Sequence, residues 1–365
     1  MKLKKSILLI CSVIWGTAEC RTHEFDNGMK FDISGYVGWK QIFSDRQFDS
    51  VPSEPDIGLT TSLKVTDRLN IFNQFRYGNS INEILVYNQI NYTPAILMED
   101  FELTIKGGKL WYDWGLYGKT RVNPRTRKGV FQPQSMYWNT LDTTITGGVG
   151  LGVDIKYKEF SISYIVDKTA VTDKNKTAGA WVTPFGTDYR SSFGGHQSVV
   201  VGYGIPEYGL RFVSHVHIFN TSYKILQHEY HAVPTIGGLG VEWEYENLTL
   251  SVEGLCTRKP KGSWAFSQLY CGISPSIEYD IDENWSVRMN YNQYSTPLLY
   301  SPVQTQNFSR DLNIGVGWHM GNWVANLQAD YIRGGRLVDP ANLLNNPYGY
   351  KEFYVVGMNL VYFWD

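Results

Sequence analysis

The stretch that decides the fold is Tyr354–Trp364, which reads YVVGMNLVYFW. Every second residue, from Tyr354 through to Trp364, is apolar or aromatic, and the residues between them are mixed. Residues 311–319, which read DLNIGVGWH, alternate more cleanly between apolar residues and Asp, Asn, Gly or His. Because successive side chains of a strand point to opposite faces, both stretches predict strands with one apolar and one polar face. Such strands occur in soluble sheets and in membrane barrels.

The N-terminus has the three parts of a secretory signal peptide. Lys2, Lys4 and Lys5 form a charged region, residues 7–15 an apolar run, and residues 16–18 (Gly-Thr-Ala) a cleavage site of small residues. The apolar run is shorter than the roughly 18–20 residues that a membrane-spanning helix needs. We therefore expect residues 1–18 to be removed on export.

The composition favours a β-protein and argues against a nucleic-acid partner. The formal charge is −2, and it falls to about −5 when the three lysines of the signal peptide are removed, whereas nucleic-acid binders are basic. The chain is 15% aromatic, contains 35 glycines and has no long apolar run after the signal peptide. Transmembrane barrels share this composition, because their strands are not hydrophobic on average.

Sixteen stretches have strand character. Most are longer than the usual strand of a globular protein, which has about 5–6 residues, and a tilted strand of about 9–11 residues can cross a bilayer. The predicted strands are 29–43, 56–66, 68–78, 83–93, 100–110, 142–157, 158–168, 196–204, 207–220, 235–246, 247–257, 265–280, 283–294, 308–319, 322–334 and 351–364.

The predicted connections alternate in length. Each even strand is followed by a short turn, and most odd strands are followed by longer loops, at 44–55, 111–141, 169–195, 221–234, 295–307 and 335–350. Outer-membrane barrels alternate in this way, with short periplasmic turns and long external loops. Closure also removes the exposed edges that an open sheet would leave. The sequence therefore predicts an all-β fold, a closed transmembrane antiparallel β-barrel of about 16 strands.

The two predicted faces differ in polarity. Apolar residues that we expect to face lipid include Leu59, Leu63, Val149, Leu151, Leu210, Phe212, Val216, Ile218, Leu239 and Val241. The opposite face carries charges that would be costly in a soluble core but can line the water of a wide barrel. Aromatic residues at strand ends, such as Trp39, Tyr77 and Tyr245, would form girdles at the two membrane interfaces.

On these residues the chain resembles the bacterial outer-membrane porins, in particular the sixteen-stranded general porins. The resemblance covers the mature chain, residues 19–365, from the opening strand Phe31-Asp32-Ile33-Ser34-Gly35-Tyr36 to the aromatic final strand. It implies one barrel domain that assembles into a homotrimer in outer-membrane lipid and lipopolysaccharide, with a water-filled lumen narrowed by an inward-folded third loop. The chain departs from the family at its end, where Asp365 follows the aromatic Trp364.

The predicted third loop, 111–141, is the longest, and loops of this length are uncommon unless they are functional. It contains five cations against a single acid, Asp113: Lys119, Arg121, Arg125, Arg127 and Lys128. Cations in a narrow lumen with low-dielectric walls focus their field on the permeating solute, and Arg and Lys favour anions. The loop therefore predicts a constriction with a mild anion preference.

Basic residues on the predicted inner wall extend this candidate solute path: Lys40, Lys64, Arg76, Lys106 and Arg211. Two alternatives remain open. The loop cations could pair with Glu83, Glu102, Asp154 or Glu242 and only hold the loop in place. The loop could instead lie outside the barrel and meet lipopolysaccharide phosphates.

Cys256 and Cys271 flank a short predicted loop within one hairpin, on the same face and at positions that can be opposed. Export permits oxidation, so we predict a disulfide, the alternative being two small apolar residues. His215 and His217, two apart beside Arg211, could be a metal pair or a proton-sensitive constriction, but we interpret them as wall residues that face water. No arrangement supports a catalytic triad, a metal site or a cofactor.

We therefore predict a non-enzymatic porin of the bacterial outer membrane, a channel for passive diffusion of small hydrophilic solutes. A channel selective for sugars or organic acids is the related alternative. An outer-membrane enzyme, or a plugged structural or adhesive barrel, would belong to a different class.

Overall fold

The computed structural model describes residues 22–44, 54–78, 85–95, 99–111, 115–116, 147–169, 190–225, 228–233, 235–259, 268–295, 308–333 and 352–364.

Within these ranges, sixteen strands form a closed antiparallel barrel. They are β2 (Lys30–Ser44), β3 (Glu54–Thr66), β4 (Leu69–Gly78), β5 (Leu85–Tyr92), β6 (Phe101–Trp111), β7 (Gly147–Tyr157), β8 (Phe160–Thr169), β9 (Arg190–Ile205), β10 (Leu210–Ile225), β12 (Thr235–Tyr245), β13 (Leu248–Lys259), β14 (Gln268–Asp280), β15 (Trp285–Ser295), β16 (Phe308–Met320), β17 (Trp323–Arg333) and β18 (Glu352–Trp364). The predicted fold class is confirmed, and each of the sixteen predicted strands has its counterpart.

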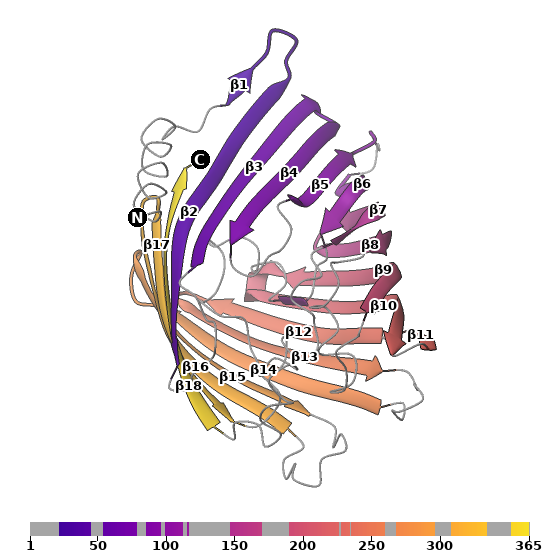
Figure 1. Ribbon diagram of the computed structural model, residues 1–365. Helices are drawn as coiled ribbons and strands as arrows, with labels where there is room; N and C mark the ends of the chain where they lie inside the picture. Colours follow the sequence, from indigo (N-terminus) through magenta and orange to yellow (C-terminus); the bar gives the residue numbers. More distant parts are fainter. Residues whose placement is uncertain are drawn as a thin grey trace, which may run out of the picture.

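The ring closes where β18 lies beside β2 (Figure 1). The register of this pair joins Trp364 to Gly35. A Cβ atom on Gly35 would collide with the Trp364 indole and with the Gly58 carbonyl oxygen, so glycine is required where these groups approach the β2 backbone. On the inner face beside the seam, four buried side chains form a small apolar cluster: Tyr36, Val324, Val361 and Phe363. In the last strand, the even-numbered side chains therefore point to the outside of the barrel and the odd-numbered ones to the inside.

Two short strands lie outside the sixteen. β1 (His23–Glu24) pairs with β2, and β11 (His228–Ala232) pairs with the end of β10. We predicted a loop at 221–234, and this was wrong for most of these residues. β10 continues to Ile225, and β11 pairs with it as the second arm of a hairpin. Each arm contains a tyrosine, Tyr223 in β10 and Tyr230 in β11, and tyrosine has a high β-propensity, which favours this extension of the sheet.

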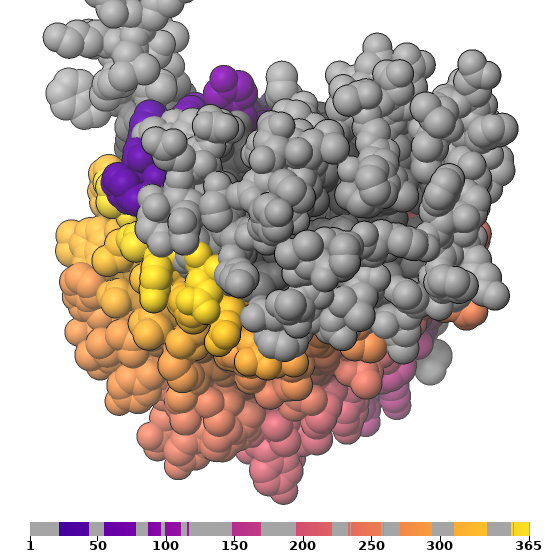
Figure 2. Space-filling model, turned by 60° about the horizontal axis from the view of Figure 1, so that its bottom comes forward, coloured from indigo at the N-terminus to yellow at the C-terminus, as the bar shows by residue number. Residues whose placement is uncertain are grey.

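The two faces of the wall have the polarity of a membrane barrel. Apolar residues are exposed on the outside, for example Leu239 at 68% and Leu151 at 63%, whereas inward polar residues are buried, for example Asn292 at 0% and Asp311 at 1%. The outer residues of the orange and yellow strands pack side by side into a continuous wall in Figure 2. A soluble protein would have the reverse distribution.

Short turns join the strands at the end of the barrel where β2 begins and β18 ends. Their backbone is satisfied locally: Thr66 Oγ1 accepts hydrogen bonds from the Arg68 and Leu69 amides, and Asp282 Oδ1 accepts from the amides of residues 284 and 285. At this end Asp67 lies 2.7 Å from Lys64, whose ammonium lowers the pKa of the Asp67 carboxyl. Across the residues that are described, no helix is long and apolar enough to cross a membrane.

Candidate functional site: the barrel lumen

Residues 115–116, which follow β6 in the sequence, lie inside the barrel. Leu116 is 7% exposed and packs with Val200 and Val213 on the inner faces of β9 and β10. Its amide donates a hydrogen bond to Glu253 Oε1 on β13 at 3.1 Å. Since β7, β8, β9, β10 and β12 lie between β6 and β13 in the ring, residues 115–116 lie against the inner wall and not beside the strand that precedes them. The predicted inward-folded third loop is therefore confirmed at residues 115–116.

Two glycines make this contact possible. Gly115 has φ +65°, in the left-handed region that favours glycine, and a Cβ atom there would overlap Glu253 Oε1. Gly240 on β12 lies beneath Leu116, and a Cβ atom on it would be 2.7 Å from Leu116 Cγ. The inner wall is therefore shaped to receive the loop closely.

The five predicted loop cations, Lys119, Arg121, Arg125, Arg127 and Lys128, lie outside the described residues. The basic residues of the wall are described, and carboxylates accompany most of them. Arg76 is buried and donates from Nε and Nη2 to Asp56 at 2.9 and 2.7 Å, while Tyr36 Oη donates to the same carboxylate at 3.2 Å. Arginine and carboxylate thus form a two-pronged pair.

The other wall cations are dispersed over the barrel. Lys106 forms an ion pair with Asp154, and Arg211 forms one with Glu242 at 3.1 Å. Lys64 forms an ion pair with Asp67, in a turn at the short-turn end of the barrel. Lys40 lies on β2 opposite Asn359 of β18. The five predicted wall residues therefore do not form one ladder. Asp154 and Glu242, which we considered as partners for the loop cations, form ion pairs with Lys106 and Arg211 of the wall.

A polar sector that the sequence reasoning did not single out lies on β14–β17. Asn290 accepts a hydrogen bond from Asn313 at 3.2 Å and donates to Ser274 at 3.0 Å, and Asn292 donates to Asp311 at 2.8 Å. Gln328 donates to Asp330 at 2.7 Å. Period two predicts the inner face for Asp311, Asn313 and Asp330, and this placement is confirmed. Which of these side chains meet depends on the register of the strands.

His215 and His217 point inward, but they are 2% and 0% exposed, so the interpretation as water-facing wall residues was wrong. They lie in a packed interior region with Phe219, Ile236 and Leu255, and His196 of β9 stacks on Phe219 at 4.5 Å. His196 was not predicted, because it is far from the pair in sequence. In the part of the chain that is described, no three His, Cys, Asp or Glu side chains are placed to hold a metal ion.

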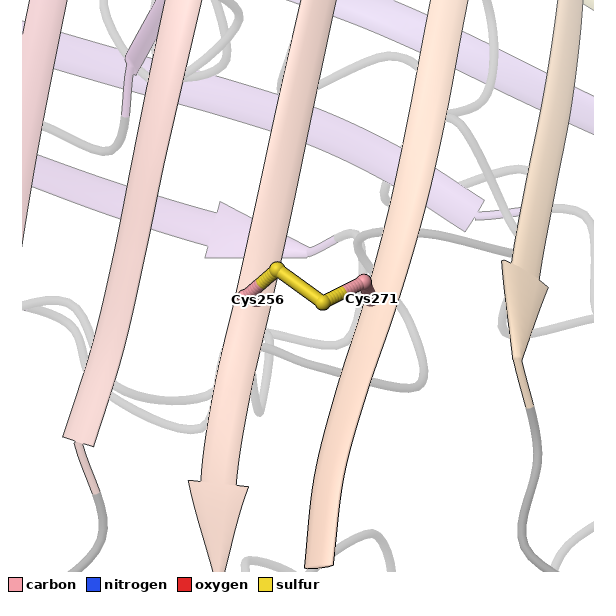
Figure 3. Close-up of a disulfide and its surroundings, with 2 residues drawn as sticks. All are labelled: Cys256 and Cys271. Atoms are coloured by element: carbon pink, nitrogen blue, oxygen red, sulfur yellow. A yellow bond between two sulfur atoms is a disulfide. The ribbon is translucent and has the colours of Figure 1, made fainter.

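Cys256 and Cys271 are directly opposed on β13 and β14, with their Cα atoms 4.1 Å apart, and they form a disulfide (Figure 3). Cys256 shares the outward-facing parity of Leu250 and Val252. The bond therefore lies on the outside of the barrel, toward the long-loop end of this hairpin, and not in the lumen.

No family model matches the sequence, and no curated protein is significantly similar to it. Solved structures are similar in fold. An anion-selective porin from Comamonas acidovorans matches with a TM-score of 0.60 at 10% identity, covering 92% of this chain and 99% of its own. OmpF of Salmonella typhi, in complex with daunomycin, matches with 0.59 at 11%, covering 93% and 99%. Outer-membrane expressed OmpT of Vibrio cholerae matches with 0.60 at 11%, covering 94% and 100%. This chain therefore has the fold of the sixteen-stranded bacterial porins.

Proposed function

We propose that this protein is an outer-membrane channel through which small hydrophilic solutes diffuse passively, with no catalytic step. The observation that carries the proposal is the reversed polarity of a closed barrel: apolar side chains are exposed outside, and polar side chains line the inside. Lipid can surround only a wall whose backbone groups are all paired, and a closed ring meets this condition. We further propose that residues 1–18 are a signal peptide that is removed on export. The barrel would then lie in outer-membrane lipid and lipopolysaccharide.

We also propose a mild anion preference, which the third loop would set. The described wall cations Arg76, Lys106 and Arg211 each face a carboxylate, so their charges are largely compensated locally. The surplus of positive charge lies in the loop, where three arginines and two lysines follow the segment that enters the lumen. The anion-selective porin with a similar fold is consistent with this preference.

The test is a bilayer measurement on the purified chain. We expect ohmic single-channel currents and, in a salt gradient, a reversal potential that indicates anion preference. Replacing Arg121, Arg125 and Arg127 together by Gln should shift that potential toward cations, because the focused positive field is removed. The matched control, K168Q, removes a cation from the outer face of β8 and should leave the potential unchanged. An unaltered potential in the triple variant would refute the loop as the selectivity element, and absence of current would refute the channel.

A second candidate, a channel for neutral sugars, is favoured by the amide network of β14–β17. Carboxamides and hydroxyls such as Asn290, Asn313 and Ser274 offer hydrogen-bond donors and acceptors without net charge. Liposome swelling separates the two candidates. Faster entry of neutral sugars than of organic acids of equal size would favour the sugar channel.

We propose a homotrimer, and the outer face of β3–β6 is our candidate for its interface. The register aligns Thr61, Asn73, Asn88 and Lys109 in one row across these strands, and Asn73 donates to Thr61 at 3.1 Å. Hydrocarbon offers no partners to such groups, whereas a second copy does.

We expect N73L/N88L to lower the trimeric fraction of the detergent-solubilised protein, measured by size exclusion with light scattering, since the interface loses its polar contacts. S214L, on the outer face of β10, is the matched control and should remain trimeric. Equal trimer content in both variants would exclude this row as the interface.

A further inference from the structure

Two asparagines on the inner wall, Asn326 of β17 and Asn359 of β18, lack the partners that buried amides normally have, and we call them the amide pair. They are 8% and 6% exposed. Neither Asn326 Nδ2 nor Asn359 Oδ1 has a hydrogen-bond partner in the part of the chain that is described. The large majority of buried side-chain polar atoms in folded proteins are paired, so these two exceptions require a physical reason.

The register places the two members of the amide pair side by side. Asn326 and Asn359 are directly opposed on adjacent strands, and the Cβ atoms of opposed residues are about 4.5–5.5 Å apart. A Cβ atom on Gly317 would be 3.3 Å from Asn326 Oδ1, so this oxygen lies toward β16, and Nδ2 lies at the other end of the carboxamide. An unpaired donor and an unpaired acceptor are therefore carried by neighbouring residues of one face.

The surroundings of the amide pair differ from side to side. Gly317 of β16 and Lys40 of β2 flank the pair in the same row of inward-facing residues, and both are only partly buried. Toward the short-turn end, Val324 and Val361 belong to the buried apolar cluster beside the seam and offer no polar group from their side chains. The pair is therefore closed on that side, and its partly exposed flanks lie along the row.

A hydroxyl group satisfies both unpaired atoms, because its oxygen accepts a hydrogen bond from Asn326 Nδ2 and its hydrogen is donated to Asn359 Oδ1. A carboxylate would satisfy only Asn326, since it has no hydrogen to donate. An ammonium group would satisfy only Asn359, since it accepts no hydrogen bond. Lys40, the cation of this row, already has an interaction of its own. The pair therefore complements a neutral hydroxylated solute better than an organic ion.

We propose that the amide pair is a binding subsite of the lumen for a neutral sugar, which places one hydroxyl group between Asn326 and Asn359. The inference rests on the proposed channel and gives its neutral-sugar alternative a specific contact on the wall. Two hydrogen bonds hold a solute only weakly, and this suits a channel, because a solute that is bound too tightly does not leave. A site that pairs with a hydroxyl also disfavours solutes that lack one, since its buried polar atoms then stay unpaired.

The test measures binding and does not depend on conduction. The full-length refolded barrel is titrated with glucose in detergent, and saturation-transfer NMR gives the dissociation constant. We expect N326L/N359L to raise this constant about tenfold, because two hydrogen bonds of modest net strength are lost. The matched control is N70L, which removes an inner-wall asparagine of β4 whose Oδ1 already accepts a hydrogen bond from Ser62, and it should bind glucose like the wild type.

A conservative variant and a second solute identify the interaction. N359D keeps an acceptor oxygen at this position and should bind glucose like the wild type, whereas succinate, an acid without hydroxyl groups, should bind equally to the wild type and to N326L/N359L.

Three results would overturn the proposal. The first is no measurable binding of glucose to the wild type, which would mean that the pair holds only water. The second is equal glucose affinity in the wild type and N326L/N359L, and the third is weaker succinate binding in that variant with glucose binding unchanged. A barrel that binds glucose at the pair without conducting would refute only the channel, and a barrel that conducts without binding glucose would refute only the subsite.

Discussion

At the scale of single residues, the pair of Arg76 and Asp56 shows how this wall tolerates charge. Both are buried, at 4% and 5% exposed, and the arginine donates two hydrogen bonds to the carboxylate. A buried charge is stable only when it is paired and hydrogen-bonded, since desolvation of a lone ion is costly. The pair is therefore a structural element of the wall between β3 and β4.

Replacing one partner should be much worse than losing a surface charge. We expect R76M to lower the free energy of unfolding by about 3–5 kcal/mol, because Asp56 stays buried without its arginine. R68M, in an exposed turn between the same strands, is the control and should change stability by less than about 0.5 kcal/mol. The measurement is reversible guanidinium unfolding in detergent or lipid. Equal midpoints for the two variants would contradict the structural role of the pair.

At the scale of elements, β12 carries two glycines that differ in what they face. Gly240 faces inward beneath Leu116, and Gly237 has only ordinary van der Waals neighbours at 3.6 Å or more. Replacing either glycine by alanine reduces the conformational freedom of the unfolded chain by the same amount. A difference between the two variants therefore reports the contact of residue 240 with Leu116.

We expect G240A to displace Leu116 and alter the single-channel conductance, whereas G237A should conduct like the wild type. The cause is a Cβ atom that would be 2.7 Å from Leu116 Cγ, well inside contact distance. Bilayer recordings of both variants provide the comparison. Identical conductance in G240A would show that residues 115–116 do not influence the open path.

The strands were predictable because period two is a local signal. The pattern at 311–319 places its apolar residues outside and its polar residues inside, as β16 does. The contacts of the lumen were not predictable in the same way. The landing of Leu116 on Glu253, or of His196 beside His217, depends on strand register and on the path of a loop, and neither is encoded within a short window. Period two placed His215 and His217 on the inner face, but it could not show that neighbouring side chains bury them there.

At the scale of the whole molecule, the outer surface is matched to hydrocarbon, and this can be tested by a single charge. Leu239 is 68% exposed on the outer face of β12. We expect L239K to cost about 2–4 kcal/mol of unfolding free energy in a lipid bilayer if the residue lies near the midplane, because the ammonium loses its water. L239M is the control and should be nearly neutral. Urea unfolding of both variants in lipid vesicles measures the difference. An unchanged unfolding midpoint in L239K would argue against lipid contact at this position.

The seam between β18 and β2 has a consequence for how the barrel forms. It joins Trp364 to Gly35, so the first and last strands of the sixteen are neighbours in space, and the strands between them complete the ring. Strands this distant in sequence pair slowly, because the chain loses conformational entropy before the stabilising contacts between them form. Until then the first and last strands have free edges that could pair with another copy. Premature termination before β18 would therefore remove the strand that closes the ring and leave the barrel open, instead of producing a smaller barrel with part of the activity.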